Sequence, residues 1–453
     1  MDSLNLKKAG KLIDEYNKMK VNARAQLHKK RLYELVVYAK EHSEYYADLY
    51  KDLPTNFTLN DLPTTSKEEL TSDYSRWSTD KDVNLDGIYD HMEKHQGDGV
   101  HYLGKYRVVS SSGTDSAPII SLYDDNMAAL LSAMHIKRSF ARKEHFWQFL
   151  KRGGRMANIY TTSGPFFYNV VADIRRHTIP FRKKRSVLMQ AQTSTGKLVS
   201  ALNDFDPAVV AGFPSVLARL ADEKKNKKLK INPVFLMADG EELTPEVRNK
   251  LEIVFGCDIT SSYSSVEGGC IAYECREHHL HLNDDWVIVE PVDFDNNPVK
   301  PGETCDHVLI TNLMNYTLPV IRYALEDKIV IYDKPCLCGN CSPWIEVKGR
   351  SLDQIILSDG AHEVIVPMDD FGEVLADVNE IRRYQIMVFP GNHFSLRLSP
   401  AKGFDKTLAY FKAEKVLRDY LKNLGIMGST ITLEKDEPKP DPLSGKYLTV
   451  IAM

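Results

Sequence analysis

Short apolar runs alternate with amphipathic stretches through the middle of the chain. Three apolar runs have the length of a buried strand, and they cover residues 119–123, 208–211 and 234–237. Stretches in which apolar side chains recur at helical spacing follow them, over residues 127–134, 216–220 and 245–254. Strands that alternate with helices predict an α/β architecture with a mostly parallel sheet.

The amino-terminal part favours helices. Over residues 1–50, apolar side chains such as Leu32 and Ala39 recur at helical spacing between charged ones. The sequence DLPTTSKEEL then predicts a further helix that begins at Thr65 or Ser66, because a hydroxyl followed three residues later by glutamate is typical of a helix start.

The pattern changes again toward the carboxyl terminus. Residues 286–332 hold three β-branched runs separated by turn residues: WVIVEPV, HVLITNL and KIVIYD. After Arg350, the strand-like runs QIIL and YQIMVF stand among polar and helical patches. We therefore expect one large domain over residues 1–349, with a helical opening over residues 1–100, and a small α+β domain over residues 350–453.

Composition narrows the class of protein. The chain has 453 residues, 43% of them hydrophobic, and 58 basic against 62 acidic residues give a formal net charge of −4. This near balance argues against nucleic acid or an anionic membrane as a partner. The chain has no apolar run long enough to span a bilayer, and its first residues do not read as a secretion signal. Seven cysteines in so long a chain do not form a disulfide framework, so we expect a cytoplasmic protein.

Several polar motifs suggest nucleotide chemistry. The loop VSSSGTDSAP, residues 109–118, offers hydroxyls and flexible backbone amides that can wrap phosphate oxygens. The segment SSYSSVEGG, residues 261–269, joins an aromatic ring to a carboxylate. An acid at a strand end, Asp327, can accept two hydrogen bonds from a sugar, and Lys446 on a glycine-containing loop can reach a phosphate. Taken singly, each motif fits a polar surface loop or a solvated side chain at least as well, and for Lys446 alone the solvated lysine is the better interpretation.

In their order and spacing, these motifs resemble the adenylate-forming enzymes. Within that superfamily the chain resembles the phenylacetate–CoA ligase branch, through the LPxTxKEEL-like stretch at 62–70, GFPSVLARLA at 212–221 and TNLxNxxxPxIRYxxxD at 311–327. The resemblance covers nearly the whole chain. It implies a large adenylate-forming domain of layered sheets and helices and a small mobile C-terminal lid domain.

The resemblance also implies a reaction. A carboxylic acid would be activated by ATP to an acyl-adenylate, with release of pyrophosphate, and the acyl group would pass to a thiol such as CoA. A carrier protein or an amine is an alternative acceptor, and a homodimer is common in the branch. An alternative of another class is a degenerate homologue that binds nucleotide or zinc without catalysis.

Site residues follow from the same resemblance. The implied ATP-binding residues are Ser111, Ser112, Gly113, Thr114, Gly240, Glu241, Tyr263 and Asp327. Among them the serine, glycine and threonine loop would hold the phosphates, residues 240–241 would border the adenine, Tyr263 would stack near it, and Asp327 would bind the ribose. The implied catalytic residues are Lys446 for the phosphate and carboxylate oxygens, Glu267 for Mg²⁺, and Arg350 for the ribose or phosphate.

The sequence departs from the family pattern at several of these motifs. Asp115 and Ser116 replace Thr-Gly in the phosphate loop, and Val266 replaces a threonine beside Glu267. Leu352 stands where the family has an acidic hinge residue. These departures motivate the non-catalytic alternative.

A cysteine-rich segment suggests a metal site. Thiolates and imidazoles suit tetrahedral Zn²⁺, and CLCGNC lies downstream of CREHHLH. By resemblance the ligands of a structural zinc would be Cys275, His281, Cys336 and Cys338, with Cys341 or His279 as substitutes. Unliganded reduced cysteines are the alternative interpretation.

The acid pocket is expected beside the nucleotide. Candidates by position are Phe166, Phe167, Tyr168, Phe213 and Ser262. Such aromatic side chains would suit an aryl or arylacetic acid, although aromatic residues also fill ordinary cores.

Overall fold

The chain divides into two compact units. The computed structural model describes residues 3–95, 99–111, 118–140, 142–162, 164–350, 354–358, 363–368, 371, 374–375, 378–441 and 445–452. The division falls between Lys348 and Gly349, one residue before the boundary expected from the sequence, and Gly445 groups with the N-terminal unit. Each unit has its own hydrophobic core.

A five-stranded parallel sheet organises half of the N-terminal unit. Its strands, in spatial order, are β4 (Ser186–Gln190), β3 (Met156–Tyr160), β5 (Val209–Gly212), β6 (Phe235–Ala238) and β7 (Asp258–Thr260). Every residue of β3, β5 and β6 is buried, as expected of a parallel sheet covered on both faces. The expected strands at 208–211 and 234–237 are confirmed within a residue, whereas β3 and β4 were not predicted.

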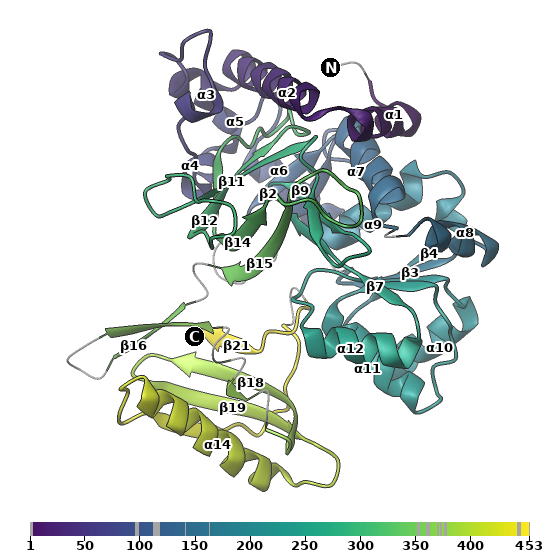
Figure 1. Cartoon of the computed structure of the whole chain (residues 1–453), viewed down its shortest axis with the longest axis vertical. Helices are drawn as coiled ribbons and strands as arrows, with labels where there is room; N and C mark the ends of the chain where they lie inside the picture. Colours follow the sequence, from purple (N-terminus) through teal and green to yellow (C-terminus); the bar gives the residue numbers. More distant parts are fainter. Residues whose placement is uncertain are drawn as a thin grey trace. The chain divides into compact units, whose positions relative to one another are not determined.

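Three helices connect these strands and lie side by side in Figure 1. They are α10 (Thr195–Phe205), α11 (Pro214–Lys225) and α12 (Pro245–Phe255). The last two begin with proline in the first turn, where the missing backbone N–H costs nothing. Thr244 caps α12 through the amide of Val247, and Gly256 ends it at φ 63°. The helices predicted over 216–220 and 245–254 are therefore confirmed.

The other half of the N-terminal unit is built on mostly antiparallel strands. A five-stranded sheet has the order β14 (Asp327–Tyr332), β15 (Trp344–Arg350), β10 (Leu280–Leu282), β9 (Gly269–Glu274) and β8 (Ser262–Ser265). A three-stranded sheet contains β11 (Val287–Val292), β12 (His307–Asn312) and β13 (Tyr323–Leu325), and a hairpin joins β1 (Arg107–Ser110) to β2 (Ile120–Tyr123). These strands confirm the three β-branched runs expected over 286–332.

Helices cover this second half. The amino-terminal ones are α1 (Leu6–Lys18), α2 (Val21–His42), α3 (Glu44–Leu49), η1 (Leu59–Asp61), α4 (Lys67–Thr71), α5 (Tyr74–Trp77) and α6 (Leu85–Lys94). Between β2 and β4 the chain adds α7 (Asp125–Arg138), α8 (Lys143–Lys151), α9 (Phe167–Thr178) and η2 (Arg182–Lys184), of which α8 instead contributes Phe149 to the core of the parallel half. Ser66 and Glu69 form the capping box of α4, so Ser66 rather than Thr65 is the cap. No helix in the described ranges is both long enough and apolar enough for a membrane span.

The C-terminal unit is an α+β fold. Its four-stranded sheet has the order β20 (Thr430–Leu433), β19 (His393–Pro400), β18 (Ile381–Phe389) and β21 (Val450–Ala452), and β16 (Gln354–Ser358) pairs with β17 (Glu363–Pro367). Helix α14 (Lys406–Asn423) packs one stripe of small and branched side chains, Ala409, Ala413, Leu417 and Leu421, into the core.

A buried ion pair joins α7 to the antiparallel half. Both terminal nitrogens of Arg138 donate to the carboxylate of Asp285, at 2.7 and 2.8 Å, and one also donates to Asn283. The side chain of Asp285 is 1% exposed and that of Arg138 is 15% exposed. The stability of either charge depends on its partner, because little water reaches the pair.

We predict that Asp285→Ala lowers the free energy of unfolding by about 3–5 kcal/mol, because the guanidinium of Arg138 is then left buried without its counter-charge. Urea-induced unfolding measures the change. Asp48→Ala is the matched control, since its pair with Arg76 is exposed to solvent, and it leaves stability nearly unchanged. Equal effects of the two variants would contradict the prediction.

Candidate active site and metal centre

The carboxyl edge of the parallel sheet contains a topological switch point. The chain leaves β3 toward β4 on one side and leaves β5 toward β6 on the other, while β3 and β5 are neighbours. The loops that follow the two strands therefore diverge, and such crevices are where open α/β sheets bind ligands. Tyr160 ends β3 and Phe213 follows β5, so the two rings flank the crevice, edge to face with centroids 5.4 Å apart.

A buried carboxyl group lies at this edge. Asp239 follows β6 and is 3% exposed, and it accepts hydrogen bonds from the hydroxyls of Ser262 at 2.9 Å and Tyr160 at 3.4 Å. Burial raises the pKa of Asp239 to about 6, against the opposing effect of the Ser262 bond. Sequence reasoning missed Asp239, although an acid directly after an apolar strand was visible in ADGEEL.

Three of the five acid-pocket candidates, Tyr168, Phe213 and Ser262, gather beside this carboxyl. Gly240 has φ 86°, and a Cβ there would lie 2.8 Å from ring atoms of both Phe213 and Tyr168. The rings of Tyr168 and Tyr160 stack with centroids 5.2 Å apart. The aromatic side chains thus pack against bare backbone at Gly240, and only glycine fits there.

The other two expected aromatic residues lie elsewhere. Phe166 forms a bridge with Ser110, at the stem of the phosphate loop, and Phe167 is a core residue that is 8% exposed. Glu241 is also engaged locally, because its carboxylate accepts bonds from the backbone amide and the hydroxyl of Ser215, both at 2.9 Å. Its carboxylate therefore fixes the start of α11. Only the backbone of Glu241 could then contact an adenine.

Two tyrosine–carboxylate hydrogen bonds tie β8 and the turn after it to β13 and β14. The phenol of Tyr263 donates to Asp327, and the phenol of Tyr323 donates to Glu267 at 3.3 Å. In each segment the acid stands four positions after the tyrosine, so the two bonds are reciprocal. Both carboxylates are mostly buried, with exposures of 7% for Asp327 and 8% for Glu267. The structure therefore brings together three residues expected at the nucleotide: Tyr263, Glu267 and Asp327.

The backbone around Glu267 is fixed as well. Asn312 donates to the carbonyl of Glu267 at 2.7 Å, and the phenol of Tyr123 donates to that of Val266 at 2.8 Å. The side chain of Val266, where the pattern that the sequence resembles has a threonine, is 4% exposed and belongs to the core. The valine thus places a methyl group among apolar neighbours, where a threonine would place a hydroxyl.

The phosphate loop closes at its stem. The amide of Ser111 donates to the carbonyl of Ile119, and the amide of Ile119 donates to the Ser111 hydroxyl, both at 3.0 Å. The remaining predicted loop residues, Ser112, Gly113 and Thr114, lie outside the described residues, as do the departures at Asp115, Ser116 and Leu352.

The last two catalytic candidates are assigned to the C-terminal unit. The backbone of Arg350 ends β15, and its side chain is outside the described part of the structure. Lys446 accepts a backbone bond from the amide of Asp441 at 2.8 Å. Their proposed roles at the nucleotide stay predictions.

The four expected zinc ligands form one cluster. One ligand atom from each of Cys275, His281, Cys336 and Cys338 lies within 4.8 Å of all the others. The Cys275 and Cys336 sulfurs are 3.8 Å apart, and the Cys338 sulfur is 3.3 Å from Nε2 of His281. Two thiolates on one tetrahedral zinc would be separated by roughly 3.8 Å, given Zn–S bonds of about 2.3 Å. The donor set therefore fits the ion in both chemistry and spacing.

Backbone groups complete the cluster. The amides of Glu277, Cys338 and Asn340 donate to three of the sulfurs, at 3.4, 3.5 and 3.3 Å. His281 points Nδ1 at the carbonyl of Ser342, 2.8 Å away, which leaves Nε2 for a metal. Of the substitutes, His279 has Nδ1 3.3 Å from the Cys336 sulfur, while Cys341 is exposed.

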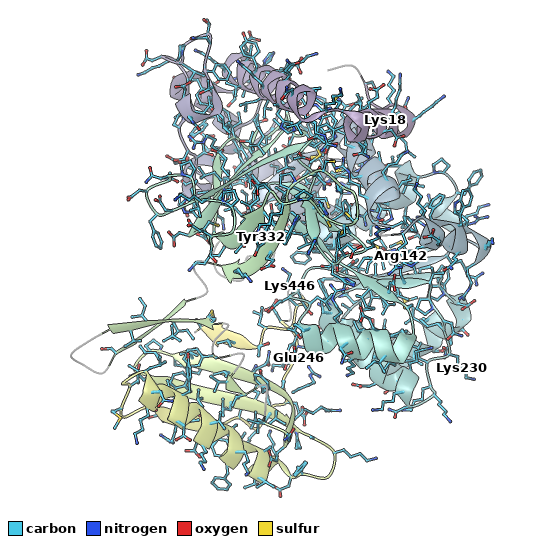
Figure 2. The ribbon with its side chains drawn as sticks, in the orientation of Figure 1. Lys18, Arg142, Lys230, Glu246, Tyr332 and Lys446 are labelled. Carbon is cyan, nitrogen blue, oxygen red and sulfur yellow. The ribbon has the colours of Figure 1, made fainter. Side chains whose placement is uncertain are left out.

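Aromatic stacking and a polar relay hold the surroundings in place. The ring of Trp344 stacks on His279 at 3.9 Å and on Tyr332, labelled in Figure 2, at 4.0 Å. The Ser342 hydroxyl donates to Asp284 at 2.7 Å, and the phenol of Tyr16 on α1 donates to the other oxygen of that carboxylate at 2.6 Å. The amino-terminal helices thus contact the loop that supports His281.

Comparison with known proteins adds two curated relatives. No protein-family model matches the chain. Protein CapK of Staphylococcus aureus is 22% identical over 319 residues, which cover 67% of this chain and 62% of that protein. Phenylacetate-coenzyme A ligase of Pseudomonas putida is 25% identical over 264 residues, 55% of this chain and 56% of the enzyme. The chain thus spans about three-fifths of the curated relatives that it matches.

Solved structures show the fold. 2-Hydroxyisobutyryl-CoA ligase, in its postadenylation state with 2-HIB-AMP, matches with a TM-score of 0.70 at 17% identity, covering 97% of this chain and 92% of that one. Acetoacetyl-CoA synthetase of Streptomyces lividans matches with a TM-score of 0.51 at 14% identity, covering 76% and 53%. At these identities the likeness establishes architecture.

We predict that the purified protein contains about one zinc per chain, because four soft donors with tetrahedral spacing bind this ion strongly. Cys338→Ser should lose most of the zinc and melt at a lower temperature. Cys341→Ser should keep the metal, since Cys341 stands outside the cluster. Elemental analysis and thermal unfolding with and without a chelator measure both effects, and metal-free wild-type protein of unchanged stability would contradict the site.

Proposed function

The chain has the fold of the adenylate-forming enzymes and resembles their phenylacetate–CoA ligase branch, and on this premise we propose that it is an ATP-dependent acid–thiol ligase. A carboxylate attacks the α-phosphorus of ATP, and pyrophosphate leaves. The acyl group of the resulting acyl-adenylate then passes to a thiol, for which CoA is our first choice. The finer proposal for the acid is an aryl or arylacetic acid, since aromatic rings flank the crevice.

The reciprocal tyrosine–carboxylate pair carries this proposal. Asp327, oriented by Tyr263, would accept both ribose hydroxyls, while Glu267, oriented by Tyr323, would bind the Mg²⁺ that accompanies the triphosphate. Mg²⁺ supplies charge neutralisation when two anions approach each other. An ordinary surface acid would not be buried and held by a tyrosine in this way.

Ser111 and its neighbours in the phosphate loop would hold the phosphate oxygens. Lys446 would neutralise charge on the phosphate and carboxylate oxygens during adenylation, as the resemblance implies, and Arg350 would contact the ribose or phosphate. The zinc cluster would act as a structural staple, because four protein ligands leave no open position for catalysis.

A non-catalytic nucleotide-binding homologue remains the competing hypothesis. It is motivated by the departures at Asp115, Val266 and Leu352. Val266 contributes to the core, and Glu267 beside it accepts a hydrogen bond from Tyr323. Exchange of pyrophosphate into ATP over a panel of acids separates the two hypotheses, since a binding protein supports none.

We predict that Lys446→Ala lowers acid-dependent ATP–pyrophosphate exchange by about two orders of magnitude or more, because a preorganised charge at the reacting phosphate is lost. Lys439→Ala is the matched control in the same unit, where Lys439 pairs with Asp436 on the surface, and it keeps the wild-type rate. Exchange by the Lys446 variant at the wild-type rate would remove this lysine from the mechanism.

We predict that Tyr263→Phe raises the KM for ATP about tenfold, because the Asp327 carboxylate loses the donor that orients it. Asp327→Ala should raise the KM further, since both ribose hydroxyls then lose their acceptor. Thermal unfolding is the control, and it should show nearly unchanged stability for the tyrosine variant. An unaltered KM in both variants would place the nucleotide elsewhere.

A further inference from the structure

The outward face of helix α8 combines apolar and basic side chains. Its inner face is fixed by His145 and Phe149, which are buried. The opposite face presents Trp147, Leu150 and Lys151 to solvent, at positions three or four residues apart that are neighbours on a helix. Trp147 is 61% exposed and Leu150 is 42% exposed. Figure 1 shows α8 at the outer edge of the N-terminal unit, so this apolar patch faces water.

A second exposed aromatic side chain belongs to a turn that packs against α8. Phe181 is 82% exposed, and its φ of 63° is a left-handed conformation that is unusual for a bulky residue. The next residue, Arg182, has its guanidinium 4.9 Å from the centroid of the Phe149 ring. The turn is therefore held to α8 from the inside, while the ring of Phe181 extends into solvent and contributes nothing to the core.

These apolar side chains are accompanied by cations without partners. Four exposed lysines on α8 and on the turn form no ion pair with a described carboxylate: Lys143, Lys151, Lys183 and Lys184. Two acids of this region are already paired, because Asp258 lies 2.7 Å from Arg142, labelled in Figure 2, and Asp206 lies 2.9 Å from Arg152. Glu144 on α8 offsets one of the four charges. The surface is therefore locally positive, although the whole chain has a formal net charge of −4.

The residue types distinguish between two classes of partner. Tryptophan is enriched where a bilayer meets water, since its ring lies at the level of the headgroups. Lysines have flexible apolar stems that reach along such a surface to anionic phosphates. Interfaces between proteins are instead depleted in lysine and enriched in arginine. Exposed aromatic rings among four lysines therefore favour an anionic lipid surface over an acidic protein.

We propose that α8 and the Phe181 turn form a docking surface for an anionic lipid bilayer. Trp147, Leu150 and Phe181 enter the headgroup region, and the four lysines contact lipid phosphates. The helix lies on the bilayer without crossing it, because its 9 residues fall far short of the roughly 20 that a span requires. The balance of charge over the whole chain argued against such a partner, since an average over the sequence does not reveal a local excess of lysines.

Co-sedimentation of the full-length protein with vesicles tests the proposal. Vesicles of phosphatidylcholine alone are compared with vesicles of phosphatidylcholine and phosphatidylglycerol in equal parts. We expect at least about tenfold stronger partitioning onto the mixed vesicles, and loss of this preference at high ionic strength, because salt screens the attraction between lysine and phosphate. Equal partitioning onto both kinds of vesicle, or none onto the mixed kind, overturns the inference.

Tryptophan fluorescence reports where the lipid makes contact. All four tryptophans lie in the described part of the chain, and only Trp147 is exposed, since Trp77 and Trp286 are buried and Trp344 is half-buried. Mixed vesicles should shift the emission to shorter wavelengths as the ring leaves water. Trp147→Phe should lose this shift while it keeps an aromatic ring for binding. A shift that persists in this variant would place the contact elsewhere and contradict the proposal.

Two double variants separate the apolar contribution from the charged one. Trp147→Ala with Leu150→Ala should weaken partitioning onto mixed vesicles about tenfold or more, because apolar area no longer enters the headgroup region. Lys143→Gln with Lys151→Gln should weaken it to a similar extent and reduce its dependence on salt. Thermal unfolding verifies the fold of both variants, which should melt like the wild type because the substituted side chains are exposed.

Matched controls remove similar groups from other surfaces. Phe294→Ala removes an exposed ring that stands between two aspartates, and Lys415→Gln with Lys422→Gln removes two exposed lysines of α14. Each should change partitioning less than about twofold. A loss in the controls equal to that in the α8 variants would overturn the proposal. Capture of the protein by immobilised polyglutamate without binding to mixed vesicles would also overturn it and assign the face to an acidic protein. These outcomes do not depend on the proposed ligase activity, because no acid or ATP enters the measurement.

Discussion

The reciprocal hydrogen bonds between two tyrosine–acid segments are the constraint on which the site depends. Tyr263 orients Asp327, and Tyr323 orients Glu267, so neither carboxylate can shift unless the opposite strand shifts as well. Both carboxylates are largely buried, so each phenol supplies a hydrogen bond that compensates for lost contact with water.

Asp239 connects the two halves of the N-terminal unit through a hydrogen bond in a similar way. It stands at the end of a strand of the parallel sheet, and the Ser262 that it binds opens the first strand of the antiparallel sheet. The short connection from β7 to β8 passes the chain from one sheet to the other. The hydrogen bond between Ser262 and Asp239 therefore ties the edge of the parallel sheet to the antiparallel half.

The sequence correctly predicted those helices and strands that depend on residues close together in the chain. The helix that begins at Ser66 follows from a capping box, and strands such as β5 and β6 follow from short, continuous apolar runs. β3 was missed because Asn158 interrupts its apolar run, and only the fold shows that this amide bonds to Ser186 on the neighbouring strand. Residues of β4 are half-buried and carry a weaker pattern.

The same distinction holds for the candidate site. Tyr263, Glu267, Asp327 and the four expected zinc ligands stand in motifs whose order is visible along the chain. Asp239 was missed because its partners, Ser262 and Tyr160, are distant in the sequence and reach it only through the packing of the fold.

The relay from His281 through Ser342 and Asp284 to Tyr16 has a consequence for how the protein is handled. Because the first helix donates to the carboxylate that supports the histidine loop, binding of a metal at the cluster would be thermodynamically linked to the packing of that helix. Chelation should then expose the amino-terminal helices to limited proteolysis, and trimming those helices for crystallisation should weaken retention of the ion.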